Sequence, residues 1–165
     1  MFREILDKVR SGAVGFSIDE VMTGTHEFEP GAGPEGVLPM EFRVTWGTER
    51  LGSWLNPRDE NFMRSPLRGT VTIEGLCRDA SCEGTLELAY FTRRRIRYAF
   101  TFKAKDTLYR YVGEKVNIRP WNLPTSHTTC YGRLTEETTG KLVSTSVTHF
   151  RLRSAPAFLA SLRLA

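Results

Sequence analysis

Residues 94–105 read RRIRYAFTFKAK, and this stretch alternates between two kinds of side chain. Its large apolar residues take every second position: Ile96, Tyr98, Phe100 and Phe102. Successive side chains of a β-strand point to opposite faces of the sheet, so this period of two predicts a strand with one buried and one solvated face. The four large apolar residues define the buried face.

The same period of two runs through most of the chain. Most connections after the third strand are short, so successive strands are expected to be antiparallel neighbours. Closing these strands into a barrel would remove their exposed edges. The sequence therefore predicts an all-β protein built as an eight-stranded antiparallel up-and-down barrel, similar in architecture to lipocalins and fatty-acid-binding proteins. A two-sheet sandwich is the alternative. The strands are expected at 13–28, 37–48, 67–77, 83–92, 94–105, 107–118, 126–136 and 141–152.

Both ends of the chain carry helical patterns. Between Phe2 and Val9 the apolar residues follow the i, i+3, i+4, i+7 spacing of an amphipathic helix, which Gly12 then ends. Near the other end Ser154 is placed to cap a helix in which three apolar residues share a face, namely Phe158, Leu159 and Leu162. We therefore expect an N-terminal and a C-terminal helix beside the barrel.

The overall composition is that of a soluble globular domain. With 165 residues, 40% of them hydrophobic and 25% charged, the chain is expected to form a single barrel domain over residues 1–165. The charged amino terminus MFREILDKVR is unlike a signal peptide, and no apolar run reaches the roughly 18 residues of a membrane span. These features predict a cytoplasmic protein without a transmembrane segment.

The three cysteines are expected to be reduced thiols, as is usual in the cytosol. Cys77 and Cys82 flank the sequence RDAS, which is read as a turn that would bring them close across a hairpin, where a disulfide is geometrically possible. A C-x4-C spacing with no second pair of Cys or His nearby is a poor zinc signature. Catalysis by Cys130 would need a histidine within hydrogen-bond reach, and a buried inert cysteine is the preferred interpretation.

One long connection interrupts the strand pattern. Residues 49–66, ERLGSWLNPRDENFMRSP, contain Asn56 followed by Pro57, which is typical of a helix start. Long connections in compact domains are often functional, so we interpret this segment as a short lid that carries Trp54 and Phe62. The alternative is a loop that only packs over one end of the barrel.

A second informative stretch, YRYVGEKVNIRPWNLPTSHTTCYGR, spans residues 109–133 and holds Trp121, His127 and Cys130. Its register depends on the preceding turn. A three-residue turn places Leu108, Arg110, Val112 and Glu114 inside the barrel, whereas a two-residue turn places Tyr109, Tyr111, Gly113 and Lys115 there. The aliphatic residues favour the first register. In that register Glu114 would lie between Tyr98 and Cys130, either as a structural ion pair with Arg110 or as the polar contact of a ligand.

The three histidines do not predict a metal site. His127 and His149 are expected to lie close together on neighbouring strands. In a closed barrel the end of the last strand, near His149, would meet Phe16 and Ile18. His26 would then lie on the order of 20 Å from His149. No glycine-rich phosphate loop or nucleophile elbow is present. We therefore expect no metal and no cofactor.

A basic run, RRR at 93–95 followed by Arg97, lies at one hairpin. Such a run is usually a solvated strand face, and it is compatible with peripheral contact with an anionic membrane. The aromatic residues of this hairpin point to the core and not outward for base stacking, which argues against nucleic acid as a partner.

Two segments, YRYVGEKVNIRPWNLPTSHTTCYG at 109–132 and LVSTSVTHFRLR at 142–153, resemble an uncharacterised bacterial domain that accompanies GMC-type, cholesterol-oxidase-like flavoproteins. The resemblance covers the second half of the chain and lacks the dinucleotide-binding glycine motif. It implies an accessory domain whose partner is a flavoprotein oxidoreductase acting on sterols or other lipids. It assigns no catalytic residue.

The sequence as a whole predicts that the barrel binds a hydrophobic small molecule such as a sterol or fatty acid. The alternatives are a small isomerase or hydrolase that uses His127 or His149 with Glu114, and a barrel that binds a protein partner through its basic hairpin. No catalytic residue is assigned under the preferred interpretation. The expected ligand-binding residues are Trp54, Phe62, Tyr98, Phe100, Glu114, Trp121, His127, Cys130 and His149.

Overall fold

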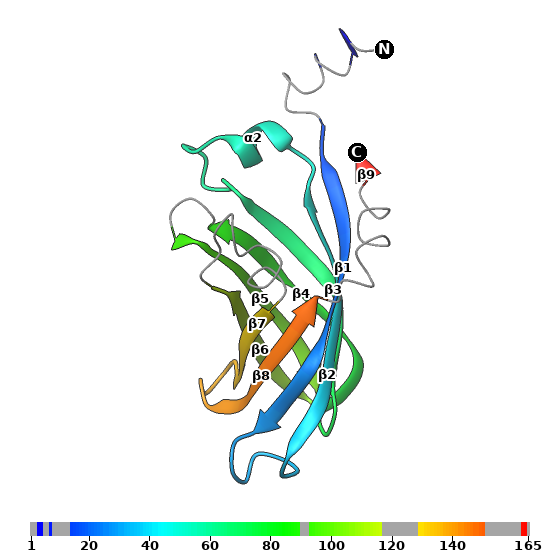
Figure 1. Cartoon of the computed structure of the whole chain (residues 1–165), viewed down its shortest axis with the longest axis vertical. Coiled ribbons are helices and arrows are strands. Elements are labelled where there is room, and N and C mark those ends of the chain that lie inside the picture. The colour runs from blue at the N-terminus through cyan, green and yellow to red at the C-terminus, as the bar shows by residue number, and fades with distance from the viewer. Residues whose placement is uncertain are drawn as a thin grey trace.

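Strands β1 to β8 pair in sequence order, and β1 pairs with both β2 and β8, so the sheet closes into an eight-stranded antiparallel barrel (Figure 1). The computed structural model describes residues 14–89, 93–116 and 129–150, together with Arg3, Glu4, Asp7 and the backbone of 163–164. The strands are β1 (Phe16–Phe28), β2 (Val37–Thr48), β3 (Arg64–Ile73), β4 (Cys77–Ala89), β5 (Arg95–Ala104), β6 (Thr107–Lys115), β7 (Thr129–Glu136), β8 (Leu142–Phe150) and β9 (Arg163–Leu164).

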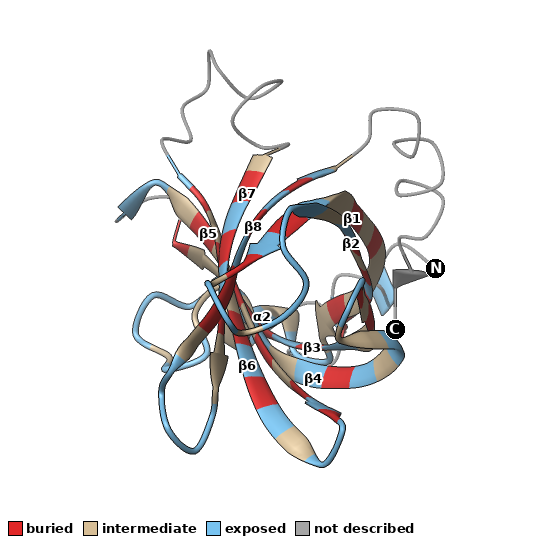
Figure 2. Ribbon diagram, turned by 90° about the horizontal axis from the view of Figure 1, so that it is seen from below, coloured by how far each residue is buried: buried red, intermediate tan, exposed pale blue. Residues whose placement is uncertain are grey.

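The predicted fold class is confirmed, and the barrel is of the up-and-down, lipocalin-like kind. Buried and exposed residues alternate along the strands, as the banding in Figure 2 shows. The one helix described in full is α2 (Leu51–Leu55). At the amino terminus Arg3, Glu4 and Asp7 are helical, and the predicted C-terminal helix lies outside the described residues. No helix in the described parts of the chain is long and apolar enough to cross a bilayer.

The two ends of the barrel differ in their connections. At the hairpin end, short turns join β3 to β4, β5 to β6 and β7 to β8, and the loop 29–36 joins β1 to β2. At the opposite end, which we call the α2 end, residues 49–63 join β2 to β3 and carry α2 (Figure 1). Strand β6 ends and β7 begins at this end as well. Among the described residues, the longest connection between strands therefore lies at the α2 end.

The turn between β5 and β6 overturns the predicted register of Glu114. Ala104 pairs with Thr107, which leaves a two-residue turn in which Lys105 and Asp106 both have positive φ, at 49° and 65°. A turn of this type matches the right-handed twist of the paired strands. The opposite register exchanges the two faces of β6. Glu114 therefore faces outward, and the interior receives Tyr109, Tyr111, Gly113 and Lys115.

The register between the first strand, β1, and the last strand of the barrel, β8, differs from the predicted one. His149 of β8 pairs with Thr23 of β1, not with Phe16 or Ile18 as predicted. The first residues of β1, Phe16 and Ser17, pair instead with β9. Closing a twisted sheet requires a shift in register between the first and last strands, and such a shift cannot be read from local sequence patterns. His26 consequently pairs with Ser146 of β8.

Two turn predictions are also corrected. The turn between β3 and β4 lies at residues 74–76, where Gly75 has φ of 88°, so the RDAS segment belongs to strand β4. Cys77 and Cys82 are free thiols on that same strand. Asn56 ends α2 and does not begin a helix, because a residue before proline is held in extended geometry and Asn56 has ψ of 111°.

Aromatic rings fill the centre of the barrel. Phe42 of β2 lies 5.6 Å from Tyr111 of β6 and 5.5 Å from Phe100 of β5, measured between ring centroids. Phe100 and Tyr111 stack at 4.8 Å. Strands β2 and β6 lie on opposite sides of the closed sheet, so these rings meet across the barrel. We call Phe42, Phe100 and Tyr111 the aromatic layer.

Candidate functional site

A buried ion pair lies inside the barrel, on the α2 side of the aromatic layer. Lys115 of β6 and Glu20 of β1 are 4% and 6% exposed, and the Lys115 Nζ donates to Glu20 Oε1 at 2.9 Å. Two further groups donate to the same carboxylate: the Tyr98 hydroxyl at 2.9 Å from both oxygens, and Trp46 Nε1 at 3.1 Å from Oε2. We call Glu20, Trp46, Tyr98 and Lys115 the buried charge cluster. A buried charge of this kind needs such partners to be tolerated.

The buried charge cluster brings opposite walls of the barrel together. Glu20 comes from β1 and Tyr98 from β5, which are four strands apart in either direction around the sheet. The Lys115 Nζ also lies 5.2 Å from the centre of the Tyr98 ring, close enough for a cation–π contact. Burial, and then the charge of Glu20, raise the pKa of the Tyr98 hydroxyl well above its usual value. Tyr98 is therefore a stable hydrogen-bond donor at neutral pH.

A second group of polar side chains continues from this cluster along β7 and β8. Tyr111 shares hydrogen bonds with Ser146 Oγ at 3.3 Å and with Cys130 Sγ at 3.9 Å. Thr148 pairs with Cys130 in the sheet and is completely buried. Its hydroxyl lies near the Tyr111 phenol and the Cys130 thiol but makes no hydrogen bond of acceptable geometry with any described residue. Thr148 thus holds an unused hydroxyl inside the barrel.

Two glycines make room for the Tyr111 side chain. A Cβ atom at Gly132 would lie 2.3 Å from the Tyr111 hydroxyl oxygen, and one at Gly113 would lie 2.8 Å from it. These distances are too short for any side chain at either position. The paired glycines of β6 and β7 therefore let the phenol lie flat against the wall. The arrangement positions its hydroxyl beside Cys130 and Ser146.

His26 occupies the hairpin side of the interior and is 2% exposed. Its Nε2 lies 2.9 Å from the Glu74 carbonyl oxygen, which can only accept, so this nitrogen carries the proton. Its Nδ1 then accepts from the Ser144 hydroxyl at 2.9 Å. Burial lowers the pKa of His26 below the ordinary value of 6.5, although the Glu74 carbonyl opposes this shift. His26 is held as a neutral imidazole.

We expect the free energy of unfolding to fall as the pH drops below about 6.5. The unfolded chain takes up a proton on His26 at that pH, while the folded chain resists it because its pKa is lowered. Stability is thus full above the unfolded pKa and declines towards the folded pKa, by at most about 1.4 kcal/mol per pH unit. Urea titrations between pH 7.5 and 5.5 measure this slope. His26→Gln keeps an amide donor for Glu74 and should flatten it; an unchanged slope would contradict the assignment.

Cys130 is expected to be unreactive in the folded protein. Burial raises the pKa of its thiol to about 11, although the charge of Lys115 works in the opposite direction. The thiolate is the reactive form, so native protein at pH 7.5 should label with iodoacetamide at Cys77, which is half-buried, well before Cys130 or Cys82. Peptide mapping by mass spectrometry gives the order. Rapid labelling of Cys130 in the native state would reverse this conclusion and revive a nucleophilic role.

Seven of the nine predicted site residues divide into three groups. Tyr98, Phe100 and Cys130 face the interior and are at most 1% exposed. Trp54 lies at the α2 end, where its Nε1 donates to Ser65 Oγ at 3.0 Å, and Phe62 is half-buried in the same connection. Trp121 and His127 lie outside the described residues.

Glu114 and His149 are corrections, because both lie on the outer face of the barrel. The Glu114 carboxylate pairs with Arg95 at 3.2 Å and lies 3.9 Å from Arg97. His149 is exposed, and its Nδ1 lies 3.2 Å from the Thr129 hydroxyl oxygen. Strand β7 separates their two strands. The acid and base expected from these residues are therefore not assembled inside the barrel.

Sequence reasoning missed most of the buried charge cluster, although a signal was present. Glu20 alternates with Ile18 and Met22 on the apolar face of β1, and a carboxylate in that register predicts a buried, partnered charge. The predicted register of β6 placed Lys115 on the outer face. In the structure Lys115 faces inward and lies between Tyr98 and Cys130, where Glu114 was expected. Of the predicted cluster, Tyr98 belongs to the observed one, whereas the inward charge on β6 is Lys115 and not Glu114.

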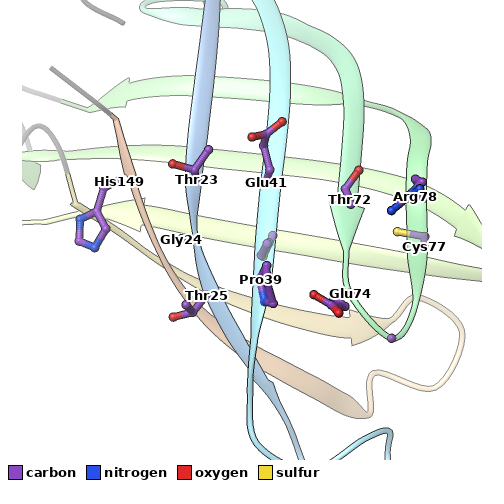
Figure 3. A pocket seen from close by; sticks show the side chains of 12 residues that line it. Thr23, Gly24, Thr25, Pro39, Glu41, Thr72, Glu74, Cys77, Arg78 and His149 are labelled. Atoms are coloured by element: carbon purple, nitrogen blue, oxygen red, sulfur yellow. The ribbon is translucent and has the colours of Figure 1, made fainter. Parts of the chain in front are cut away.

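A separate hollow of about 870 Å³ lies on the outer face of β8, β1, β2, β3 and β4. Figure 3 shows His149 and Arg78 at opposite ends of this row of strands. Its walls are mostly solvated strand faces, and one of its charged groups, Glu41, already pairs with Arg43 at 2.6 Å. The buried charge cluster is the stronger candidate, because exposed polar groups are already satisfied by water and gain little from a ligand.

The fold and the cluster together define the class of this protein: a closed, lipocalin-like barrel with an ion pair and a hydrogen-bonded tyrosine inside. The described residues contain no group of three or more His, Cys, Asp or Glu side chains that could hold a metal ion. Comparison of the chain with family models, curated proteins and solved structures finds no match.

Proposed function

We propose that the barrel binds a hydrophobic small molecule, such as a sterol or another lipid, at its α2 end. The polar group of this ligand contacts the buried charge cluster, and its apolar part lies towards the connection that carries α2. The single observation that carries the proposal is the Glu20–Lys115 pair, with both side chains at most 6% exposed inside an otherwise mainly apolar wall. Replacing such a pair with apolar residues is often neutral or stabilising, so its presence favours a role beyond stability.

Inward-facing apolar residues at the α2 end support this location. Phe16, Ile18 and Leu88 lie on the inner face yet are only half-buried, whereas the inner residues near the aromatic layer are almost completely buried. Ligand sites in barrels are typically apolar walls with a few polar groups. The half-buried residues supply the apolar wall, and the buried charge cluster supplies the polar contact.

The connection between β2 and β3 supplies a cover for this end. The Trp54 ring packs edge-on against Phe16 at 5.1 Å, and Phe16 in turn contacts Trp46 at 5.8 Å. Trp46 donates to Glu20. Trp54 is thus linked to the buried charge cluster through two ring contacts, which supports its proposed role as a lid residue.

The resemblance of residues 109–132 and 142–153 to a domain that accompanies GMC-type flavoproteins fits the same proposal. A binding domain beside an oxidoreductase that acts on sterols or other lipids would hold the substrate or the product of that enzyme. We propose this flavoprotein as the protein partner.

Native mass spectrometry of the purified protein, before and after incubation with a bacterial lipid extract, tests the binding proposal. We expect a one-to-one complex with a small lipid. The double variant Glu20→Gln/Lys115→Met keeps the side-chain volumes, removes both charges and should weaken the complex. Tyr98→Phe is a milder second variant that removes one donor.

Glu114→Gln is the matched control, because it removes a carboxylate from the outer face of the same strand as Lys115. The control should bind as the wild type does. Circular dichroism of each variant establishes that it is folded. The proposal fails if the wild type captures no lipid. It also fails if the folded double variant and the folded Tyr98→Phe variant both bind the lipid with unchanged affinity.

A further inference from the structure

In the buried charge cluster the acceptors are fully used, whereas the donors are not. Glu20 accepts from three groups, so both of its carboxylate oxygens are occupied. A lysine ammonium has three N–H donors, and Glu20 is the one described acceptor for Lys115. Among the described residues, a ligand that enters this site therefore meets spare N–H donors of Lys115, while the Glu20 carboxylate is fully occupied. The ligand can use these donors only if it brings an acceptor of its own.

Thr148 adds a second free donor. Its hydroxyl is completely buried and has no described partner of acceptable geometry. Thr148 pairs with Cys130 in the sheet, and Cys130 is close enough to Lys115 to feel its charge. The two donors therefore flank Cys130 on neighbouring parts of the inner wall. An unsatisfied buried hydroxyl is costly, so a ligand oxygen that accepts from it would gain affinity.

The charges of the described interior already balance. Glu20 and Lys115 are its two buried ionised side chains, since His26 is held neutral. A free fatty acid is ionised at neutral pH and would add an uncompensated negative charge in a region with little water. A neutral carbonyl oxygen adds no charge and can still accept a hydrogen bond from each of the two donors. The balance therefore disfavours an acid.

We propose that this site selects a neutral carbonyl compound, a ketone or an ester with an apolar chain, over the free acid of the same length. The carbonyl oxygen accepts from Lys115 Nζ and Thr148 Oγ1, and the apolar chain lies along Phe16, Ile18 and Leu88. This selection rests on the proposed function and names the chemical class of its ligand. The aromatic layer limits how deep the chain can enter.

Titration of the wild type at pH 7.4 with 2-decanone, decanoate and decane, followed by native mass spectrometry, tests this selection. We expect 2-decanone to bind about tenfold more tightly than decanoate or decane, the change that corresponds to one well-made buried hydrogen bond. Binding of all three with equal affinity, or preference for decanoate, would overturn the selection while leaving the proposed function intact. Binding of none would overturn both.

Glu20→Gln gives a sharper readout, because it removes the negative charge and leaves Lys115 positive. The preference should then invert, with decanoate binding more tightly than 2-decanone. Thr148→Val removes the free hydroxyl at nearly constant volume and should reduce the affinity for 2-decanone but not for decane. Glu114→Gln should keep the wild-type order. Unchanged preferences in folded Glu20→Gln and Thr148→Val would assign selectivity to other residues.

Discussion

Lys115→Met should destabilise the barrel by about 3–5 kcal/mol, among the largest effects of any single substitution in this chain. Methionine fills nearly the same volume, so the loss comes from Glu20, which would remain buried with its countercharge removed. Equilibrium unfolding in urea, monitored by circular dichroism, measures the change in the free energy of unfolding.

The double variant Glu20→Gln/Lys115→Met is the control for this result. It removes both charges, so it should be clearly more stable than Lys115→Met alone, with a coupling energy of a few kcal/mol between the two positions. If the two single losses simply add in the double variant, then the ion pair is not the source of the effect. Loss of packing around Lys115 would be the explanation in that case.

Phe42→Ala should cost about 3–5 kcal/mol by leaving a cavity in the aromatic layer. Phe42 is completely buried and contacts rings from two other strands across the barrel. The surrounding rings are held by the closed sheet and cannot collapse into the space. The same urea titration measures the loss.

Phe42→Leu and Val37→Ala are the controls for Phe42→Ala. Leucine keeps most of the buried volume and should cost less than alanine does. Val37 is 67% exposed on β2, so Val37→Ala should change stability by no more than about 0.5 kcal/mol. A loss below 1 kcal/mol in Phe42→Ala would mean that the centre of the barrel is not packed as described.

The alternation of side chains was enough to predict the barrel. Each strand can be recognised from its own residues, and β5 is the clearest example, because Ile96, Tyr98, Phe100 and Phe102 are all buried as expected. Closure followed from the number of strands and their short connections. These properties are local or additive, so a single sequence contains them.

The register of β6 and the stagger of the closure could not be predicted in the same way. Both faces of β6 carry large side chains, with Leu108 and Val112 on one and Tyr109 and Tyr111 on the other. The choice depends on φ at Lys105 and Asp106 and on packing against Phe42, which lies far away in the sequence. The aliphatic face became the outer one, and Leu108 is 38% exposed.

The candidate site shows the same division between local and distant information. Tyr98 was predicted as an interior residue because it lies in a clear strand pattern, and Cys130 was predicted as a buried, inert cysteine. The Glu20–Lys115 pair joins residues 95 positions apart in the sequence. The charge at Lys115 enters the interior only in the register that the sequence did not favour. The partner of a buried charge is fixed by the closed fold, not by the pattern around it.

The resonance of the Trp46 indole N–H is the most direct test of where the ligand binds, because this group donates to Glu20. It can be assigned in the ¹⁵N-labelled protein with the variant Trp46→Phe. Titration with 2-decanone should shift this resonance in a saturable manner and leave the side-chain resonances of His149, in the outer hollow, unchanged. A saturable shift at His149 with a silent Trp46 would place the ligand on the outer face and contradict binding at the buried charge cluster.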